Sequence, residues 1–165
     1  MERRVAWLGI GLIAAGVILM AGSAAFAGPG SAGRPGPWGV GGPNVASGPD
    51  PGSPGFVAGT TSAPRVVRIV AGGDLRFYPD VVTVKQGETI TFEVTTMGPV
   101  THEFMVGPAA DVAADTPGTP EISDIGMMAT KSLTYTFTGP GPFAFACHAT
   151  GHYEAGMRGT IVITP

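Results

Sequence analysis

From Arg65 to the end of the sequence, short runs of β-branched and aromatic residues are separated by clusters of turn-forming residues. Hydrophobic and polar positions alternate along these runs, so that Ile90, Phe92 and Val94 share one face, and the alternation recurs over 132–138. A period of two residues is typical of β-strands with one buried face. The predicted strands are 65–71, 81–84, 89–95, 101–106, 132–138, 143–147 and 159–164.

The number and spacing of these strands predict an all-β fold, a Greek-key β-sandwich of about seven to eight strands with antiparallel pairing. The segments KQGET (85–89) and TGPGP (138–142) are rich in turn residues and are expected to connect strands. Residues 107–130 form a longer connection with at most one helical turn. Helical periodicity is not sustained anywhere after residue 27.

The N-terminal segment 1–27 has the features of an export signal. Charged residues at positions 2–4 precede an uncharged apolar stretch from Val5, and an A-x-A motif ends at Ala27. The stretch is also long enough to cross a membrane, so a cleaved signal peptide and a retained anchor (a tether through 5–27) both remain open. Either one places the remaining chain outside the cytoplasm, at the periplasmic or extracellular face.

About half of residues 28–64 are Gly or Pro, and bulky apolar side chains are rare there. Such a segment buries too little surface to offset the entropy of ordering, so it is predicted to be a disordered linker. The folded domain is therefore expected to cover 65–165.

Charge excludes one class of partner. The formal net charge is -3, and acidic and basic residues are scattered singly along the sequence. Binding to nucleic acid relies on clusters of basic side chains that neutralise phosphates, and this sequence has no such cluster.

The only cysteine lies in the segment CHATGHYEAGM, which joins the last two predicted strands. Cys147, His152 and Met157 follow one another there with the spacing C-x4-H-x4-M. A thiolate, an imidazole and a thioether are soft ligands that suit copper, and a type 1 copper site combines two histidines and one cysteine with a weak axial methionine. The loop therefore predicts a copper site that takes a second histidine from elsewhere in the chain.

The sequence contains three histidines, so the choice is small. His148 follows Cys147 directly, and adjacent residues at a strand end point to opposite sides. His102, at the edge of an upstream strand, is the natural fourth ligand. Other roles stay open: a buried structural thiol or an intermolecular disulfide for Cys147, packing for Met157, and ligation by His148 in place of His152.

These residues together resemble the cupredoxins, the family of small blue or green copper proteins. The resemblance rests on His102 in HEF, on CHATGHYEAGM and on the final strand, and it covers 65–165. The loop spacing is similar to that of auracyanins and rusticyanins, and the motifs also resemble exported bacterial cupredoxins associated with copper handling. The resemblance implies one copper ion held by His102, Cys147, His152 and Met157, with His152 as the more exposed ligand.

One position departs from the family pattern. Many cupredoxins have Asn or Ser after the upstream histidine, where its side chain ties the two ligand loops together, whereas Glu103 stands here. The departure puts the hydrogen bonding around the ligands, and hence the reduction potential, in doubt.

The expected function is one-electron transfer between Cu(II) and Cu(I), with redox proteins as transient partners of a monomer. The alternative is copper binding for resistance or homeostasis. An enzyme with several coppers would need more histidines, so no catalytic activity is expected. Two further features stay open: Met127-Met128 as a second copper-capturing pair, and 97–99 as an apolar collar around the copper.

Overall fold

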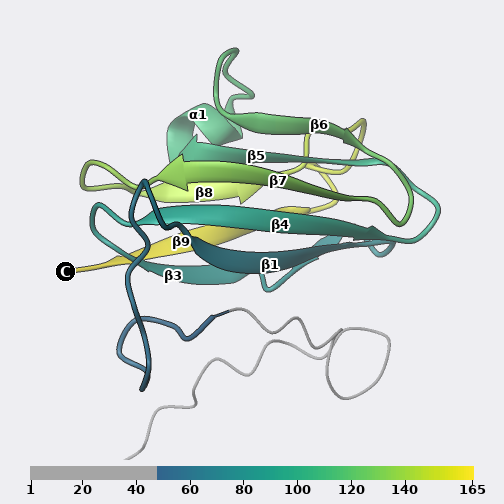
Figure 1. The fold of residues 1–165 in the computed structure, drawn as a ribbon. Coiled ribbons are helices and arrows are strands. Elements are labelled where there is room, and N and C mark those ends of the chain that lie inside the picture. Colours follow the sequence, from purple (N-terminus) through teal and green to yellow (C-terminus); the bar gives the residue numbers. More distant parts are fainter. Residues whose placement is uncertain (1–47) are drawn as a thin grey trace, which may run out of the picture. The chain divides into compact units, whose positions relative to one another are not determined.

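The computed structural model describes residues 48–165, which form nine β-strands and one short helix (Figure 1). The predicted signal or anchor (1–27) and the first part of the predicted linker (28–47) lie outside the described residues. The elements are β1 (Arg65–Gly72), β2 (Arg76–Tyr78), β3 (Val81–Lys85), β4 (Thr89–Met97), β5 (His102–Pro108), α1 (Ala109–Ala113), β6 (Glu121–Ile125), β7 (Thr130–Thr136), β8 (Phe143–Ala146) and β9 (Arg158–Thr164).

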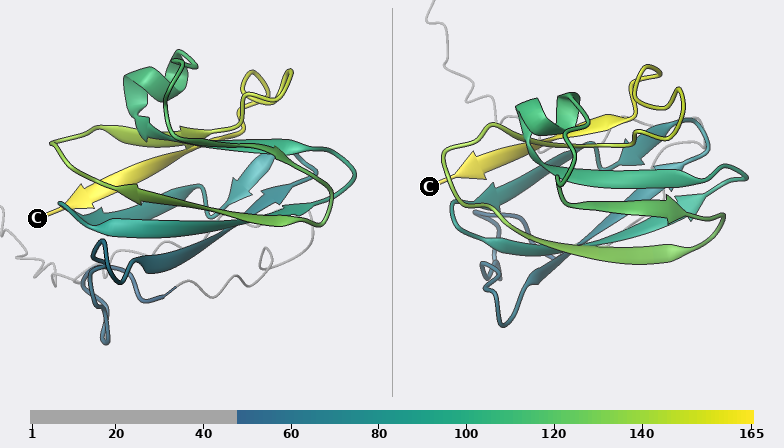
Figure 2. Two further views of the ribbon diagram at one scale, coloured as in Figure 1. Left: turned by 45° about the horizontal axis from the view of Figure 1, so that its top comes forward. Right: turned by 90° about the horizontal axis from the view of Figure 1, so that it is seen from above.

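The strands form two sheets that pack face to face. One sheet has the order β2-β1-β4-β7, and the other has the order β3-β9-β8-β5-β6. Figure 2 shows the two layers, with α1 lying outside the second sheet, where it packs on β5 and β8. The all-β sandwich predicted from the sequence is therefore confirmed.

Alternating side chains fill the space between the sheets. Ile90, Phe92 and Val94 of β4 are fully buried on one face, as their period-two spacing predicts. Phe104 lies at the centre of an aromatic cluster, with ring centroids 5.2 Å from Phe92 and 5.4 Å from Phe145. Such aromatic pairs contribute about 0.5–1.5 kcal/mol each beyond the area they bury. Phe104 and Phe145 sit two residues from His102 and Cys147, so the core holds both strands that lead to the predicted ligands.

The prediction of purely antiparallel pairing is wrong for two pairs of strands. β1 runs parallel to β4, with Arg65 opposite Ile90, and β3 runs parallel to β9, with Val81 opposite Thr160. Alternation of hydrophobic residues shows which face of a strand is buried, but it contains no information on the direction of the neighbouring strand. Both sheets are therefore mixed.

The long connection predicted over 107–130 is more structured than expected. It contains α1, which buries Val112, and the strand β6, which pairs with β5 across an irregularity between His102 and Phe104. The three-residue strand β2 was also not predicted. α1 and β2 are too short for a periodic pattern to stand out, and in β6 the apolar residues Ile122 and Ile125 are three positions apart, so they do not alternate.

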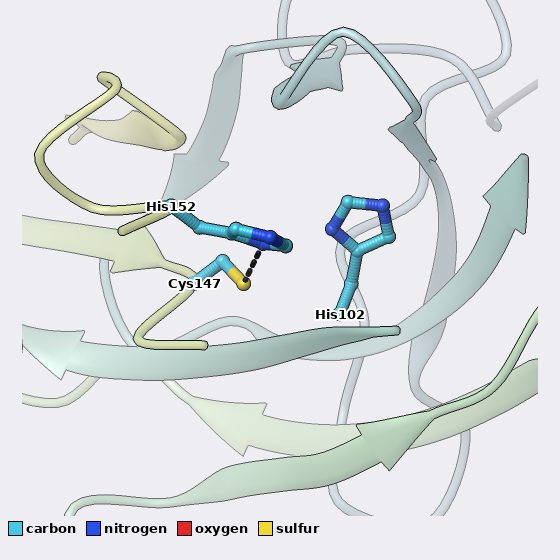
Figure 3. Close-up of side chains that lie close together, drawn as sticks. All are labelled: His102, Cys147 and His152. Carbon is cyan, nitrogen blue, oxygen red and sulfur yellow. Dashed lines mark hydrogen bonds between the residues drawn. The ribbon is translucent and has the colours of Figure 1, made fainter. Parts of the chain in front are cut away.

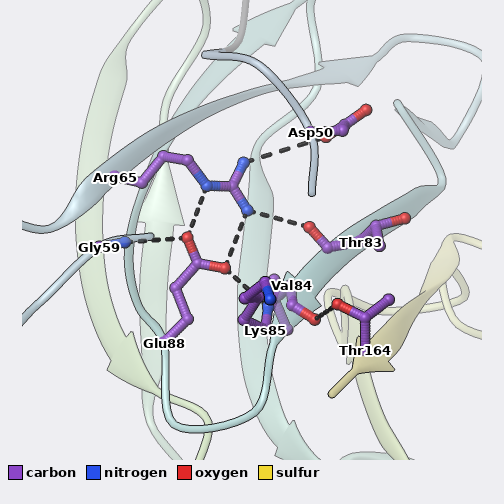
Figure 4. A network of polar contacts seen from close by, with 8 residues as sticks. All are labelled: Asp50, Gly59, Arg65, Thr83, Val84, Lys85, Glu88 and Thr164. Atoms are coloured by element: carbon purple, nitrogen blue, oxygen red, sulfur yellow. Dashed lines mark hydrogen bonds and ion pairs between the residues drawn. The ribbon is translucent and has the colours of Figure 1, made fainter. Parts of the chain in front are cut away.

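The last part of the predicted linker, 48–64, contacts the sandwich (Figure 4). The N–H of Gly59 donates a hydrogen bond of 3.0 Å to the buried carboxylate of Glu88, and the Gly59 carbonyl accepts one of 3.0 Å from the N–H of Thr89. A Cβ on Gly59 would lie 2.0 Å from the Thr89 carbonyl oxygen, so only glycine fits this close approach. The segment is held because the carboxylate of Glu88 needs donors once it is buried.

Within residues 48–165, no helix has the length and apolar character needed to cross a membrane.

Candidate metal centre

Two neighbouring strands bring the predicted ligands together at one end of the sandwich. His102 is the first residue of β5, and Cys147 directly follows β8. β5 and β8 are antiparallel, with Met105 opposite Ala146, so the start of one strand lies beside the end of the other. His152 and Met157 lie on the loop from β8 to β9, which is at the same end of the sandwich as the start of β5 (Figure 1).

Three of the four predicted ligands form a compact cluster (Figure 3). One ligand atom from each of His102, Cys147 and His152 can be chosen so that all lie within 4.8 Å of one another. The Cys147 Sγ is 3.3 Å from His152 Nδ1, and the two imidazole rings have centroids 5.0 Å apart. A thiolate and two imidazoles converging at this distance match the plane of a type 1 copper site.

His102 provides the sharpest test of whether a metal fits. The residue is completely buried, and within the described part of the chain neither ring nitrogen has a hydrogen-bond partner. Leaving a buried polar group unsatisfied costs about 1–3 kcal/mol. Burial and the neighbouring His152 lower the pKa of His102 from 6.5 to about 4, so the ring is neutral at physiological pH. Neutral imidazole is the form that binds metals, and a metal would satisfy an otherwise orphaned nitrogen.

Cys147 is fully buried, and its sulfur lies 3.3 Å from Nδ1 of His152. Burial raises the pKa of the thiol, while a hydrogen bond of 3.2 Å from the Glu103 N–H to Sγ acts in the opposite direction. An intermolecular disulfide needs an accessible sulfur, so the complete burial of Cys147 argues against that alternative. A purely structural thiol leaves the two imidazoles beside it unexplained.

Glu103, the position that departs from the family pattern, contacts the other ligand segment through its backbone. Its backbone N–H, rather than its side chain, connects the strand of His102 to the sulfur of Cys147. The connection between the two ligand segments therefore does not require Asn or Ser at this position. A backbone donor of this kind cannot be recognised from residue types.

Met157, the fourth predicted ligand, belongs to the same buried cluster as Cys147 and is fully buried. Its carbonyl accepts a hydrogen bond of 3.1 Å from the Cys147 N–H, and its own N–H donates one of 3.0 Å to the His152 carbonyl. These bonds close the ligand loop at both ends. His152 is only partly buried, whereas His102, Cys147 and Met157 are buried, so His152 is the most exposed of the four.

One residue that supports the loop was missed in the sequence. Arg76 of β2 donates a hydrogen bond of 2.9 Å from Nη1 to the carbonyl of Gly156. Gly156 has a φ of 93°, and a Cβ there would lie 2.5 Å from the same nitrogen. Because β2 is so short, no sequence pattern marks Arg76 as a neighbour of the loop.

His148 points away from the ligand cluster. Its Nε2 is 2.8 Å from the carbonyl oxygen of Val112 in α1, and its ring stacks on Tyr153 with centroids 4.8 Å apart. The alternative in which His148 replaces His152 is therefore not supported by the geometry. Met127 and Met128 are exposed, whereas Met157 is buried beside Cys147.

Comparisons with known proteins point in the same direction as the geometry. The family described as copper binding proteins, plastocyanin/azurin family, matches residues 65–164. The copper-resistant cuproprotein CopI of Rubrivivax gelatinosus is 34% identical over 122 residues, covering 68% of this chain and 72% of its own. CopI of Pseudomonas aeruginosa is 28% identical, covering 66% of this chain and 81% of its own.

Solved structures of two auracyanins share the fold. Auracyanin B superposes with a TM-score of 0.53 at 21% identity, covering 66% of this chain and 95% of its own. Auracyanin A, a blue copper protein of Chloroflexus aurantiacus, has the same TM-score at 22% identity, covering 62% of this chain and all of its own. With a family match over 65–164 and a cluster of one thiol and two imidazoles inside it, this chain belongs to the plastocyanin/azurin family of copper-binding proteins, with copper as its cofactor.

Proposed function

We propose that His102, Cys147, His152 and Met157 would hold one copper ion, and that the protein carries single electrons. The observation that supports this most directly is His102, which lies beside the sulfur and the second imidazole and whose two buried nitrogens have no hydrogen-bond partner among residues 48–165. Bound copper supplies one-electron chemistry between Cu(II) and Cu(I).

The protein's own residues prepare the site. The pairing of β5 with β8 fixes His102 against Cys147, and the Glu103 N–H orients the sulfur. Hydrogen bonds at Met157 hold the loop closed, so little rearrangement is needed when the oxidation state changes. Four protein ligands leave no open position for a substrate, which is why we propose a carrier rather than an enzyme.

His152 is the natural route for electrons to leave the buried site, because it is the most exposed of the four proposed ligands. A redox partner would contact this end of the sandwich over a small area, as is usual for transient electron-transfer complexes. The protein itself is proposed to act as a monomer.

Voltammetry of the copper-loaded full chain tests the carrier proposal. We expect a reversible one-electron wave that is lost in His152→Gln and kept in His148→Gln, a matched histidine outside the ligand cluster. A wave that survives His152→Gln, or one that is irreversible in the parent protein, would contradict the proposal.

Copper resistance is the second candidate, and it is favoured by the similarity to the copper-resistant cuproproteins CopI. Deletion of the gene would then lower the highest copper concentration at which the host still grows. The parent gene should restore growth and a Cys147→Ser allele should not. If the deletion strain tolerates copper as well as the parent strain, resistance is not the function.

We further propose that the protein is exported, through residues 1–27 as a signal peptide or a retained anchor. Cell fractionation followed by N-terminal sequencing tests this directly. A new N-terminus at Gly28 indicates cleavage, an intact Met1 in the membrane fraction indicates an anchor, and recovery in the cytoplasm would contradict export.

A further inference from the structure

Three methionine side chains are exposed at the end of the sandwich that holds the ligand cluster. The exposed fractions are 41% for Met97 and 64% each for Met127 and Met128. Within residues 48–165 they make up half of the large hydrophobic side chains that are exposed. Methionine normally fills gaps in a core, but side chains as exposed as these are not part of a core.

Strand pairing brings the segments that carry two of these methionines together. β4 and β7 are antiparallel, with Thr95 opposite Thr130, and the N–H of Thr96 donates a hydrogen bond of 3.0 Å to the carbonyl of Ala129. Met97 follows Thr96 and Met128 precedes Ala129, so this hydrogen bond brings the two segments together next to both methionines.

The third methionine, Met127, precedes Met128 in the turn between β6 and β7. The turn is closed by a hydrogen bond of 3.1 Å from the Ala129 N–H to the Gly126 carbonyl. Three sulfur atoms are thus carried by the end of β4 and by one tight turn. Figure 1 shows the end of β4 and the β6–β7 connection at the same end of the sandwich as the start of β5.

This group lies next to the ligand cluster without sharing a residue with it. His102 is paired with Ile125, the last residue of β6, and the turn that carries the two methionines begins at the following residue. An ion held by the exposed thioethers would therefore be a short distance from the buried histidine.

The backbone of Met128 has an uncommon conformation, shared in the described residues by Leu75, Asp115 and Asp124. Its φ is 57°, in the left-handed region where Gly or Asn is usual and where a bulky side chain is costly. A residue that served only to make the turn would be expected to be one of these. Such outliers gather where a side chain has a function.

We propose that Met97, Met127 and Met128 form a surface site for a soft monovalent cation, Cu(I). Thioether sulfur selects Cu(I) over harder divalent ions, and these three side chains bring no carboxylate that would favour the latter. The site is separate from the buried centre and does not depend on the function proposed for it.

Methionine methyl NMR during titration with Ag(I) tests this site. Ag(I) is a redox-inert stand-in for Cu(I), and the full chain is used as its Cys147→Ser variant so that the buried thiolate does not compete. We expect the methyl signals of Met97, Met127 and Met128 to move together and to saturate at a 1:1 ratio. The signal of Met105, which is 3% exposed, should stay in place.

Substitution by leucine, which conserves volume, identifies the ligands. The combined Met97→Leu, Met127→Leu and Met128→Leu variant should lose Ag(I) binding, and Met105→Leu should retain it. Independent movement of the three signals, or movement of Met157 alone, would overturn the proposal. Equally strong binding of Ag(I) to the triple variant would also overturn it. So would the absence of any signal change, which would leave the exposed methionines as a surface for protein contact. None of these results bears on the buried centre, because the thiolate is absent from the experiment.

Discussion

Replacing Glu88 by Gln tests the account of how the segment 48–64 is held against the sandwich (Figure 4). Glu88 is 2% exposed, and its carboxylate accepts hydrogen bonds from Arg65 Nε at 2.7 Å, from the Gly59 N–H at 3.0 Å and from the Lys85 N–H at 2.8 Å. The Arg65 side chain is itself 6% exposed. Glu88→Gln therefore leaves a buried guanidinium that faces a neutral amide.

Removing one partner of a buried ion pair costs about 3–5 kcal/mol. Asp50 lies 3.9 Å from Arg65 Nη1 and compensates part of the remaining charge, so we expect about 3 kcal/mol, the lower end of this range. In urea unfolding of the copper-free protein, this loss lowers the midpoint by about 1–3 M. The matched control is Glu93→Gln. It removes a similar pair with Arg68 at 3.0 Å on the surface and should cost at most about 1 kcal/mol.

The difference between the parent protein and Glu88→Gln should also depend on pH. Burial raises the pKa of Glu88, but the hydrogen bonds from Arg65, Gly59 and Lys85 outweigh it and lower the pKa from 4.5. A lowered pKa means that ionised Glu88 stabilises the fold above pH 4.5 and that this stability is lost as the pH falls through the folded-state value. A loss no larger than that of Glu93→Gln, or a loss that is the same at pH 7 and pH 3, would refute the reasoning.

Three further predictions follow from packing around the site. Met157→Ala should destabilise the copper-free protein by about 2–5 kcal/mol in urea unfolding. Met157→Leu should cost less than about 1.5 kcal/mol and yet alter the visible spectrum of the copper-loaded protein. An unaltered spectrum would show that Met157 is not a ligand. Gly159→Ala places a Cβ 2.1 Å from Phe145 Cζ and should lower the free energy of unfolding by about 1–3 kcal/mol. Gly126→Ala, where a Cβ meets no atom within 4 Å, should leave the free energy of unfolding unchanged. Equal effects of the two substitutions would contradict the close contact at Gly159. Glu103→Ala should leave the copper spectrum unchanged, because the backbone N–H contacts the sulfur, and a large shift would show that the side chain contributes.

Most strands of the sandwich were predictable because they combine alternation with β-branched or aromatic residues. β4, β7 and β9 are all recognised in this way. Alternation cannot show strand direction, so the expected antiparallel sandwich did not include the parallel pairs β1–β4 and β3–β9. β2 contains too few residues for a period to emerge, and the two isoleucines of β6 are not in alternation.

The candidate ligands were predictable for a different reason. With one cysteine and three histidines in the chain, residue type and spacing alone reduced the choice to very few sets. The supporting contacts were not predictable, because they use backbone atoms and residues from distant elements. The Glu103 N–H on the sulfur and Arg76 on the Gly156 carbonyl are examples.

Residues 48–64 show a similar limit. Their Gly and Pro content resembles that of a linker, but contact with the sandwich depends on Gly59 and on a buried carboxylate in the turn 85–89. The sequence identifies this turn by its glycine and polar residues. It does not show that Glu88 points inward and recruits donors from another segment.

The measurement that tests the central claim most directly is the visible spectrum of the Cu(II)-loaded full chain, recorded beside its Cys147→Ser variant. If Cys147, His102 and His152 bind copper together, the parent protein shows an intense thiolate-to-copper band that is absent from the variant. A weak ligand-field spectrum that is the same in both proteins would contradict the proposed centre.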